Sequence, residues 1–142
     1  MRYAEMVQMH QKEVNNFPMF FAFSNEQFEE GRKRLGIRKA EIEKKIIGIG
    51  AGCYMRKDDF PLWRDLVLRH LAEKKAEIEN PVTGVEFACD MFVTEMYNHE
   101  YTCTYDQAEV LDACGISQIQ FENNEILKTA WNKAEKIVFA EE

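Results

Sequence analysis

The chain has 142 residues, of which 46% are hydrophobic and 30% charged, and its net charge is −7. This length and apolar content predict one folded domain over residues 1–142 and exclude an intrinsically disordered chain. The charge is uneven, because residues 1–80 carry a balance of +2 and residues 81–142 carry −9. The acidic second half would repel nucleic acid and anionic lipid, so we expect neither DNA binding nor membrane binding.

The sequence contains no apolar run long enough to cross a bilayer. Its first residues, MRYAEMVQMHQKEV, lack the continuous apolar block of a secretory signal. Four cysteines are present and none of them form a CxxC pair. Free, mostly buried thiols are typical of a reducing compartment, so we expect the protein in the cytoplasm.

The first quarter of the chain predicts a helix, a strand and a second helix. Residues 3–14 place apolar side chains at helical spacing. Residues 17–23 (FPMFFAF) are short and aromatic, and they predict a strand with both faces covered, because both faces are apolar. Ser24 and Gln27 then form a capping-box pattern, which begins a helix that ends at Gly36.

Residues 45–57 alternate around three glycines and predict a β-hairpin. A long helix is expected to end at Asn80, and Thr83 begins a second capping-box pattern for a helix that ends near Asn98. Residues 99–104 (HEYTCT) alternate and predict a strand.

Two further helices are expected, one that ends at Cys114 and a last one over about residues 124–138. Together these elements predict an α+β fold. We expect a small, mainly antiparallel sheet of about three to four strands, covered by five or six helices.

Two groups of residues are candidates for binding. Glu95 and His99 are one helical turn apart, with Glu100 and Tyr101 next along the chain, so a carboxylate and an imidazole would share a helix face. The simpler interpretation is that His99 ends a helix. The glycine-rich stretch 48–52, followed by Arg56 and Lys57, could hold an anion, but a glycine-rich hairpin is the favoured interpretation, because the strand-like CYMRK, and no helix, follows the glycines.

No constellation indicates catalysis or a cofactor, and the Glu95 and His99 pair has no predicted third ligand for a metal, so we expect no metal, no cofactor and a protein that is not an enzyme. The helix–turn–helix rhythm of residues 105–134 lacks the basic recognition helix that a DNA reader needs. The basic cluster Arg32, Lys33 and Arg34 leaves RNA as an alternative partner.

Three stretches, NNFPMFFAFSNEQFEEG, the glycine hairpin followed by RK, and MYNHEYTCTYDQAEVLDACGIS, resemble a family of small proteins classified as a domain of unknown function. The resemblance covers nearly the whole chain. It implies an origin in Gram-positive bacteria, their phages or mobile elements, and an accessory role in the bacterial cytoplasm. It implies no activity and no catalytic residue.

The sequence therefore favours a non-enzymatic protein-interaction module, whose acidic half complements a basic partner. The alternative is a small-ligand or metal-binding site around His99, Glu95 and Glu100. A homodimer is a further alternative if one face of the strand at residues 17–23 is uncovered.

Overall fold

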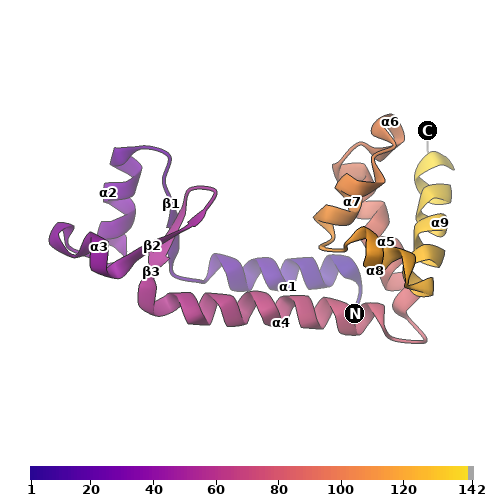
Figure 1. The fold of residues 1–142 in the computed structure, drawn as a ribbon, viewed down its shortest axis with the longest axis horizontal. Coiled ribbons are helices and arrows are strands. Elements are labelled where there is room, and N and C mark those ends of the chain that lie inside the picture. Colours follow the sequence, from indigo (N-terminus) through magenta and orange to yellow (C-terminus); the bar gives the residue numbers. More distant parts are fainter. Residues whose placement is uncertain (141–142) are drawn as a thin grey trace. The chain divides into compact units, whose positions relative to one another are not determined.

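The structure is a computed structural model that describes residues 1–140 (Figure 1). The chain divides into two compact units. Unit 1 comprises Met1–His10 and the chain from Ala72 onward, and unit 2 comprises Gln11–Leu71. The first and fourth α-helices each contribute residues to both units.

The α-helices are α1 (Tyr3–Asn15), α2 (Asn25–Arg34), α3 (Ile42–Lys45), α4 (Phe60–Ile78), α5 (Gly84–Asn98), α6 (Tyr101–Thr104), α7 (Gln107–Ala113), α8 (Gln118–Glu122) and α9 (Glu125–Ala140). The strands are β1 (Met19–Phe21), β2 (Ile46–Gly50) and β3 (Cys53–Arg56). Short 3-10 helices cover Lys39–Glu41 and Lys57–Asp59.

The expected α+β fold is wrong. The structure is 71% helical, with nine α-helices in the described residues and a sheet of three antiparallel strands. All three strands belong to unit 2, whereas α5 to α9 belong to unit 1 and pack mainly on one another. The helices therefore do not cover a common sheet, because most of their apolar faces are buried against other helices.

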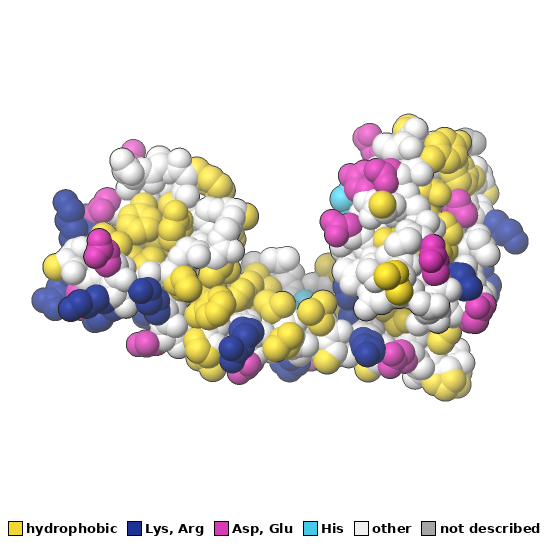
Figure 2. Space-filling model, viewed as in Figure 1, with side chains coloured by type: hydrophobic (Ala, Val, Ile, Leu, Met, Phe, Trp, Pro, Cys, Tyr) yellow, Lys and Arg dark blue, Asp and Glu magenta, His cyan; other side chains and the backbone are white. Residues whose placement is uncertain are grey.

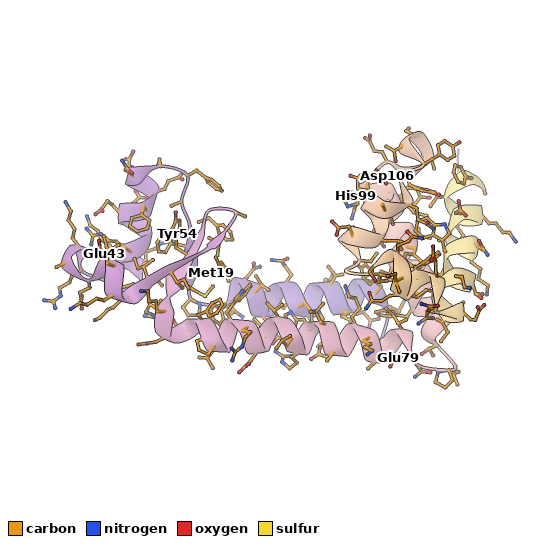
Figure 3. The ribbon with its side chains drawn as sticks, in the orientation of Figure 1. Met19, Glu43, Tyr54, Glu79, His99 and Asp106 are labelled. Atoms are coloured by element: carbon orange, nitrogen blue, oxygen red, sulfur yellow. The ribbon has the colours of Figure 1, made fainter. Side chains whose placement is uncertain are left out.

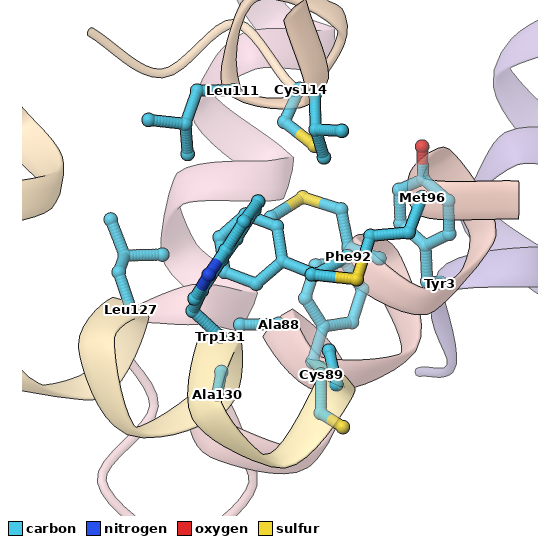
Figure 4. Close-up of a cluster of buried hydrophobic side chains, with 14 of the residues drawn as sticks. Tyr3, Ala88, Cys89, Phe92, Met96, Leu111, Cys114, Leu127, Ala130 and Trp131 are labelled. Carbon is cyan, nitrogen blue, oxygen red and sulfur yellow. The ribbon is translucent and has the colours of Figure 1, made fainter. Parts of the chain in front are cut away.

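Unit 1 has a helical core built around α5 and α9 (Figure 4). Ala88 on α5 and Ala130 and Ala134 on α9 are fully buried, and such small side chains let two helices approach closely. The rings of Phe92 and Trp131 meet edge to face beside them, with centroids 5.0 Å apart. The core contains nineteen buried hydrophobic residues, so this unit buries most of the apolar surface of the chain.

The strand expected at residues 99–104 is wrong, because this segment contains the one-turn helix α6. Glu100 and Tyr105 bracket the turn in left-handed backbone conformations, with φ of 52° and 54°. Such conformations are uncommon for residues other than glycine. They reverse the chain within a few residues, and Tyr101 consequently points into the core, where it is buried.

The hairpin expected over residues 45–57 is confirmed as β2 and β3, which form the sheet of unit 2 in the order β1-β3-β2 (Figure 3). Phe20 on β1 lies opposite Tyr54 on β3, and their rings stack at 5.4 Å. Both rings also contact Phe28 of α2 edge to face. Gly31 lets α2 approach this closely, because a Cβ there would lie 2.1 Å from a ring carbon of Phe20.

The two faces of the aromatic strand differ more than the sequence indicates. Phe20 and Ala22 are buried on one face, and Met19 and Phe21 occupy the other, in the expected alternation. The expectation that both faces are covered is wrong, because Phe21 is 56% exposed and Phe23 is 78% exposed. The aromatic run is therefore partly core and partly surface.

The capping patterns of two helices are only partly as expected. Ser24 does cap α2, since its hydroxyl accepts the N–H of Gln27 at 3.2 Å, but the Gln27 side chain accepts from Phe23 instead of Ser24. Thr83 makes no side-chain cap for α5. Asn80 instead orders the turn before α5, because its side-chain oxygen accepts the backbone N–H groups of Val82 at 2.9 Å and Thr83 at 3.1 Å.

Candidate functional site

His99 lies between two carboxylates in unit 1. It is the C-cap residue of α5, so the interpretation that it ends a helix is confirmed. Its Nε2 lies 3.5 Å from a carboxylate oxygen of Glu95, one turn earlier on the same helix. Its Nδ1 lies 3.1 Å from a carboxylate oxygen of Glu109 on α7. Both ring nitrogens therefore face groups of the protein itself.

Glu95 connects this pair to the core. Its side chain accepts a hydrogen bond from the Tyr3 hydroxyl at 3.1 Å. Burial and the Glu95 carboxylate together hold the pKa of Tyr3 well above its ordinary value. The same two causes raise the pKa of the Cys114 thiol to about 12. Tyr3 and Cys114 lie with Phe92 and Met96 in the interior of unit 1 (Figure 4).

Glu100 and Tyr101 do not join His99 in a pocket. Glu100 is exposed and precedes α6, and Tyr101 is 5% exposed. The Tyr101 hydroxyl donates to Glu135 at 3.0 Å, and its ring packs on Trp131 at 5.2 Å. Burial and this hydrogen bond raise the pKa of Tyr101 to about 12. The structure brings together Glu95 and His99, and it contains no group of three metal-ligating side chains among the described residues.

Arg56 and Lys57, the expected anion ligands, make internal contacts in unit 2. The Arg56 guanidinium pairs with Asp59 at 2.8 Å and donates to the carbonyl of Leu35 at 3.2 Å. The Lys57 ammonium donates to the carbonyl of Glu43 at 2.7 Å. Because the glycine-rich turn leads into strand β3, no helix N-terminus follows it to present amides to an anion.

The basic cluster that left RNA as an alternative is smaller than its sequence indicates. Arg32 is buried, and its guanidinium donates to the carbonyl of Ile37 and pairs with Glu29. Only Lys33 and Arg34 of the triplet are exposed. Farther along, hydrogen bonds from Lys45 and Arg38 lower the pKa of Glu41 to about 2.

Sequence reasoning missed an aromatic and acidic surface on unit 1. Tyr105 is 68% exposed and stacks on Phe139 of α9, with ring centroids 5.7 Å apart. Phe139 and Glu135 line an open depression on α9 together with Asn132 and Lys136. We name Tyr105, Phe139 and Glu135, together with the exposed Glu100 at the start of α6, the aromatic-acidic surface. The spacing of Tyr101 and Tyr105, four residues apart, was the available signal, but the alternation of residues 99–104 obscured it.

Acidic side chains gather around the connection between α6 and α7 on the face that Figure 2 shows. His99 and Asp106, both labelled in Figure 3, are connected there through Glu109, whose carboxylate faces His99 and whose N–H bonds to Asp106. Asp106 is the N-cap of α7, since its carboxylate accepts the N–H of Glu109 at 3.1 Å. Some acids near the aromatic-acidic surface therefore stabilise the fold, as Asp106 does, whereas others, such as Glu100, are exposed.

The cysteines separate by exposure. Cys103 on α6 is exposed, whereas Cys53, Cys89 and Cys114 are buried. Burial raises the pKa of Cys53, and burial together with Asp90 raises that of Cys89. The buried thiols are consequently poor nucleophiles.

A family model matches residues 2–136, and the chain belongs to this family, DUF7659, a family of unknown function. The expected resemblance to a domain of unknown function is thereby confirmed. A search of curated proteins and a search of solved structures each gave no match. No described helix is both long and apolar enough to span a membrane.

Proposed function

We propose that the protein is a non-enzymatic interaction module that binds a basic partner protein through the aromatic-acidic surface of unit 1. The observation that carries this proposal is the separation of charge between the units. Unit 1 has 6 basic and 16 acidic residues, a net charge of −10, and unit 2 has 12 basic and 9 acidic residues, a net charge of +3. A strongly acidic unit attracts a positively charged surface and steers its approach.

The exposed side chains on unit 1 suit arginine in particular. A guanidinium stacks well on an exposed aromatic face, and Tyr105 offers one that Phe139 supports from behind. The exposed Glu100 can then pair with the charge of the stacked group, and the half-buried Glu135, which also accepts the Tyr101 hydroxyl, adds a second carboxylate. The alternative of a small-ligand site is less well supported, because its candidate residues contact other groups of the protein. These residues are His99, Glu95, Arg56 and Lys57.

The test is affinity capture from cells of the natural host, with nuclease-treated and untreated lysates in parallel. The partner should still be captured after nuclease treatment. Its recovery should fall as the salt concentration rises, because salt screens exposed charge pairs. The double variant Glu100→Gln with Tyr105→Asn should lose it. Asparagine suits residue 105, because it tolerates the left-handed backbone conformation found there.

The matched control is Glu86→Gln, which removes one exposed acid from α5 outside the aromatic-acidic surface. This variant should retain the partner. Capture that is equally strong with both variants, or that disappears with nuclease, would refute the proposed surface.

A further inference from the structure

We propose that a second copy of the chain pairs with β1, so that two unit 2 sheets join into one six-stranded antiparallel sheet. This inference is independent of the proposed function, which uses unit 1. It starts from the position of β1, which is an edge strand in the order β1-β3-β2. An edge strand presents backbone N–H and C=O groups that another strand can bind.

The register of the sheet shows which backbone groups face outward. Met19, Phe20 and Phe21 lie opposite Met55, Tyr54 and Cys53, respectively. The N–H of Ala22 donates to the carbonyl of Gly52 at 2.9 Å, so these two residues form a hydrogen-bonded pair. Bonded pairs alternate along an antiparallel ladder.

This alternation makes Phe20 the next residue bonded to β3, and it directs the N–H and C=O groups of Met19 and Phe21 toward the outer edge. The N–H of Phe23 is already bonded to the side chain of Gln27, which limits the open edge at that end. Pro18 limits it at the other end, because proline has no N–H.

Apart from its short length and the flanking Pro18, β1 lacks the features that usually prevent strand pairing. Proteins guard such edges with charged residues, bulges or covering segments. Residues 17–23 contain no charged residue, and Phe21 is 56% exposed. By contrast, β2 at the opposite edge has an irregular register between Gly48 and Gly50. Of the two edges, β1 is therefore the one suited to a partner strand.

A second copy fits this edge because the pattern is self-complementary. In a two-fold arrangement centred on Phe20, Met19 of each copy lies opposite Phe21 of the other, and both pairs are of the hydrogen-bonded kind. Four backbone hydrogen bonds would form, and each methionine sulfur would meet an aromatic ring across the junction. A charged strand would repel its own copy in such an arrangement, whereas this strand is uncharged.

The available area indicates a weak dimer. Phe21 and Phe23, at 56% and 78% exposure, together offer roughly 300 Å² of accessible surface, if a phenylalanine exposes ~200 Å² in full. A stable interface typically buries about 800 Å² per partner. We therefore expect association only at protein concentrations on the order of 100 μM or above.

The test combines sedimentation with amide hydrogen exchange, measured by NMR on the full chain at ~10 μM and ~1 mM. The sedimenting mass should double across this range. The Met19 and Phe21 amides should become protected only at the higher concentration, while the Phe20 amide is protected at both. A chain that stays monomeric at ~1 mM, or a dimer in which the Met19 and Phe21 amides still exchange freely, overturns the proposal.

Phe21→Lys supplies the matching variant, because an edge lysine blocks pairing while its exposed position leaves the core intact. Its dimer should be lost and the Phe20 amide should stay protected. Ile119→Lys is the control, since it makes the same change at a side chain of unit 1 that is 72% exposed, and its dimer should persist. Equal dimerisation of both variants overturns the proposal. A chain that does not dimerise through β1 could still bind a basic partner through unit 1, so the results of the two tests distinguish the two proposals.

Discussion

The contact between Gly31 and Phe20 permits a sharp test of how unit 2 is packed. Alanine in place of a helical glycine normally stabilises a protein by up to about 1 kcal/mol. At residue 31, however, the new Cβ would lie 2.1 Å from a ring carbon of Phe20. Carbon atoms in contact prefer about 3.5–4.0 Å, so the ring must move by more than ~1 Å.

The ring of Phe20 has little room for this movement. It is 2% exposed and lies 5.6 Å from the ring of Phe28 and 5.4 Å from that of Tyr54. Overpacking of this kind typically costs about 1–3 kcal/mol. After a helix gain of about 1 kcal/mol is subtracted, we expect Gly31→Ala to lower the free energy of unfolding of unit 2 by up to about 2 kcal/mol.

Urea denaturation, followed through the NMR indole signal of Trp63 in the same unit, measures this change. Phe20→Leu provides the matched background, because a smaller side chain leaves space for the new methyl group. The double variant should recover about 1 kcal/mol relative to the sum of the single changes. A Gly31→Ala variant that is more stable than the native protein, or strictly additive effects, would refute the packing argument.

Two further predictions concern unit 1. Asn80→Ala should lower its stability by about 1 kcal/mol, because the Asn80 side chain holds the N–H groups of Val82 and Thr83 in the turn before α5. Thr83→Ala should change it little, because the Thr83 side chain makes no cap. Urea denaturation that shows equal losses in both variants would contradict this assignment. Stability should also fall as pH rises above about 9. Cys114 and Tyr101 have ordinary pKa values of 9.0 and 10.0, but the folded state raises both pKa values to about 12. The unfolded chain therefore loses these protons at lower pH than the folded chain, which favours unfolding. Urea midpoints should decline less between about pH 8 and pH 10 in Cys114→Ala, and an unchanged decline would contradict the assignment.

Elements with a local signal were predictable from the sequence. The glycines of the hairpin fix a tight turn, since Gly50 and Gly52 adopt positive φ values of 101° and 75°. Ser24 begins its helix because the cap lies within three residues of the groups that it satisfies. In each case the deciding interactions are close together in the chain.

Elements decided by distant contacts were not predictable. Residues 99–104 alternate like a strand, yet Tyr101 is held in the core by Trp131 and Glu135, which are at least 30 residues away. The left-handed residues Glu100 and Tyr105 carry no glycine signal. The division into two units was equally hidden, because unit 1 joins residues 1–10 to a segment that begins at Ala72.

The candidate site was predictable only in part. The spacing of Glu95 and His99 correctly places them together. The second carboxylate beside His99 belongs to Glu109. The sequence does not indicate this contact, because Glu109 lies on a different helix, α7. The aromatic-acidic surface depends on the stacking of Tyr105 on Phe139, 34 residues later.

The exposure of the four thiols has a practical consequence for studying this protein. Because Cys103 is exposed and the other three cysteines are buried, a maleimide dye should attach at one position without any mutagenesis. Cys103 belongs to α6, the turn that Glu100 and Tyr105 bracket. A polarity-sensitive dye there would convert the native chain into a fluorescent reporter of whatever binds beside it.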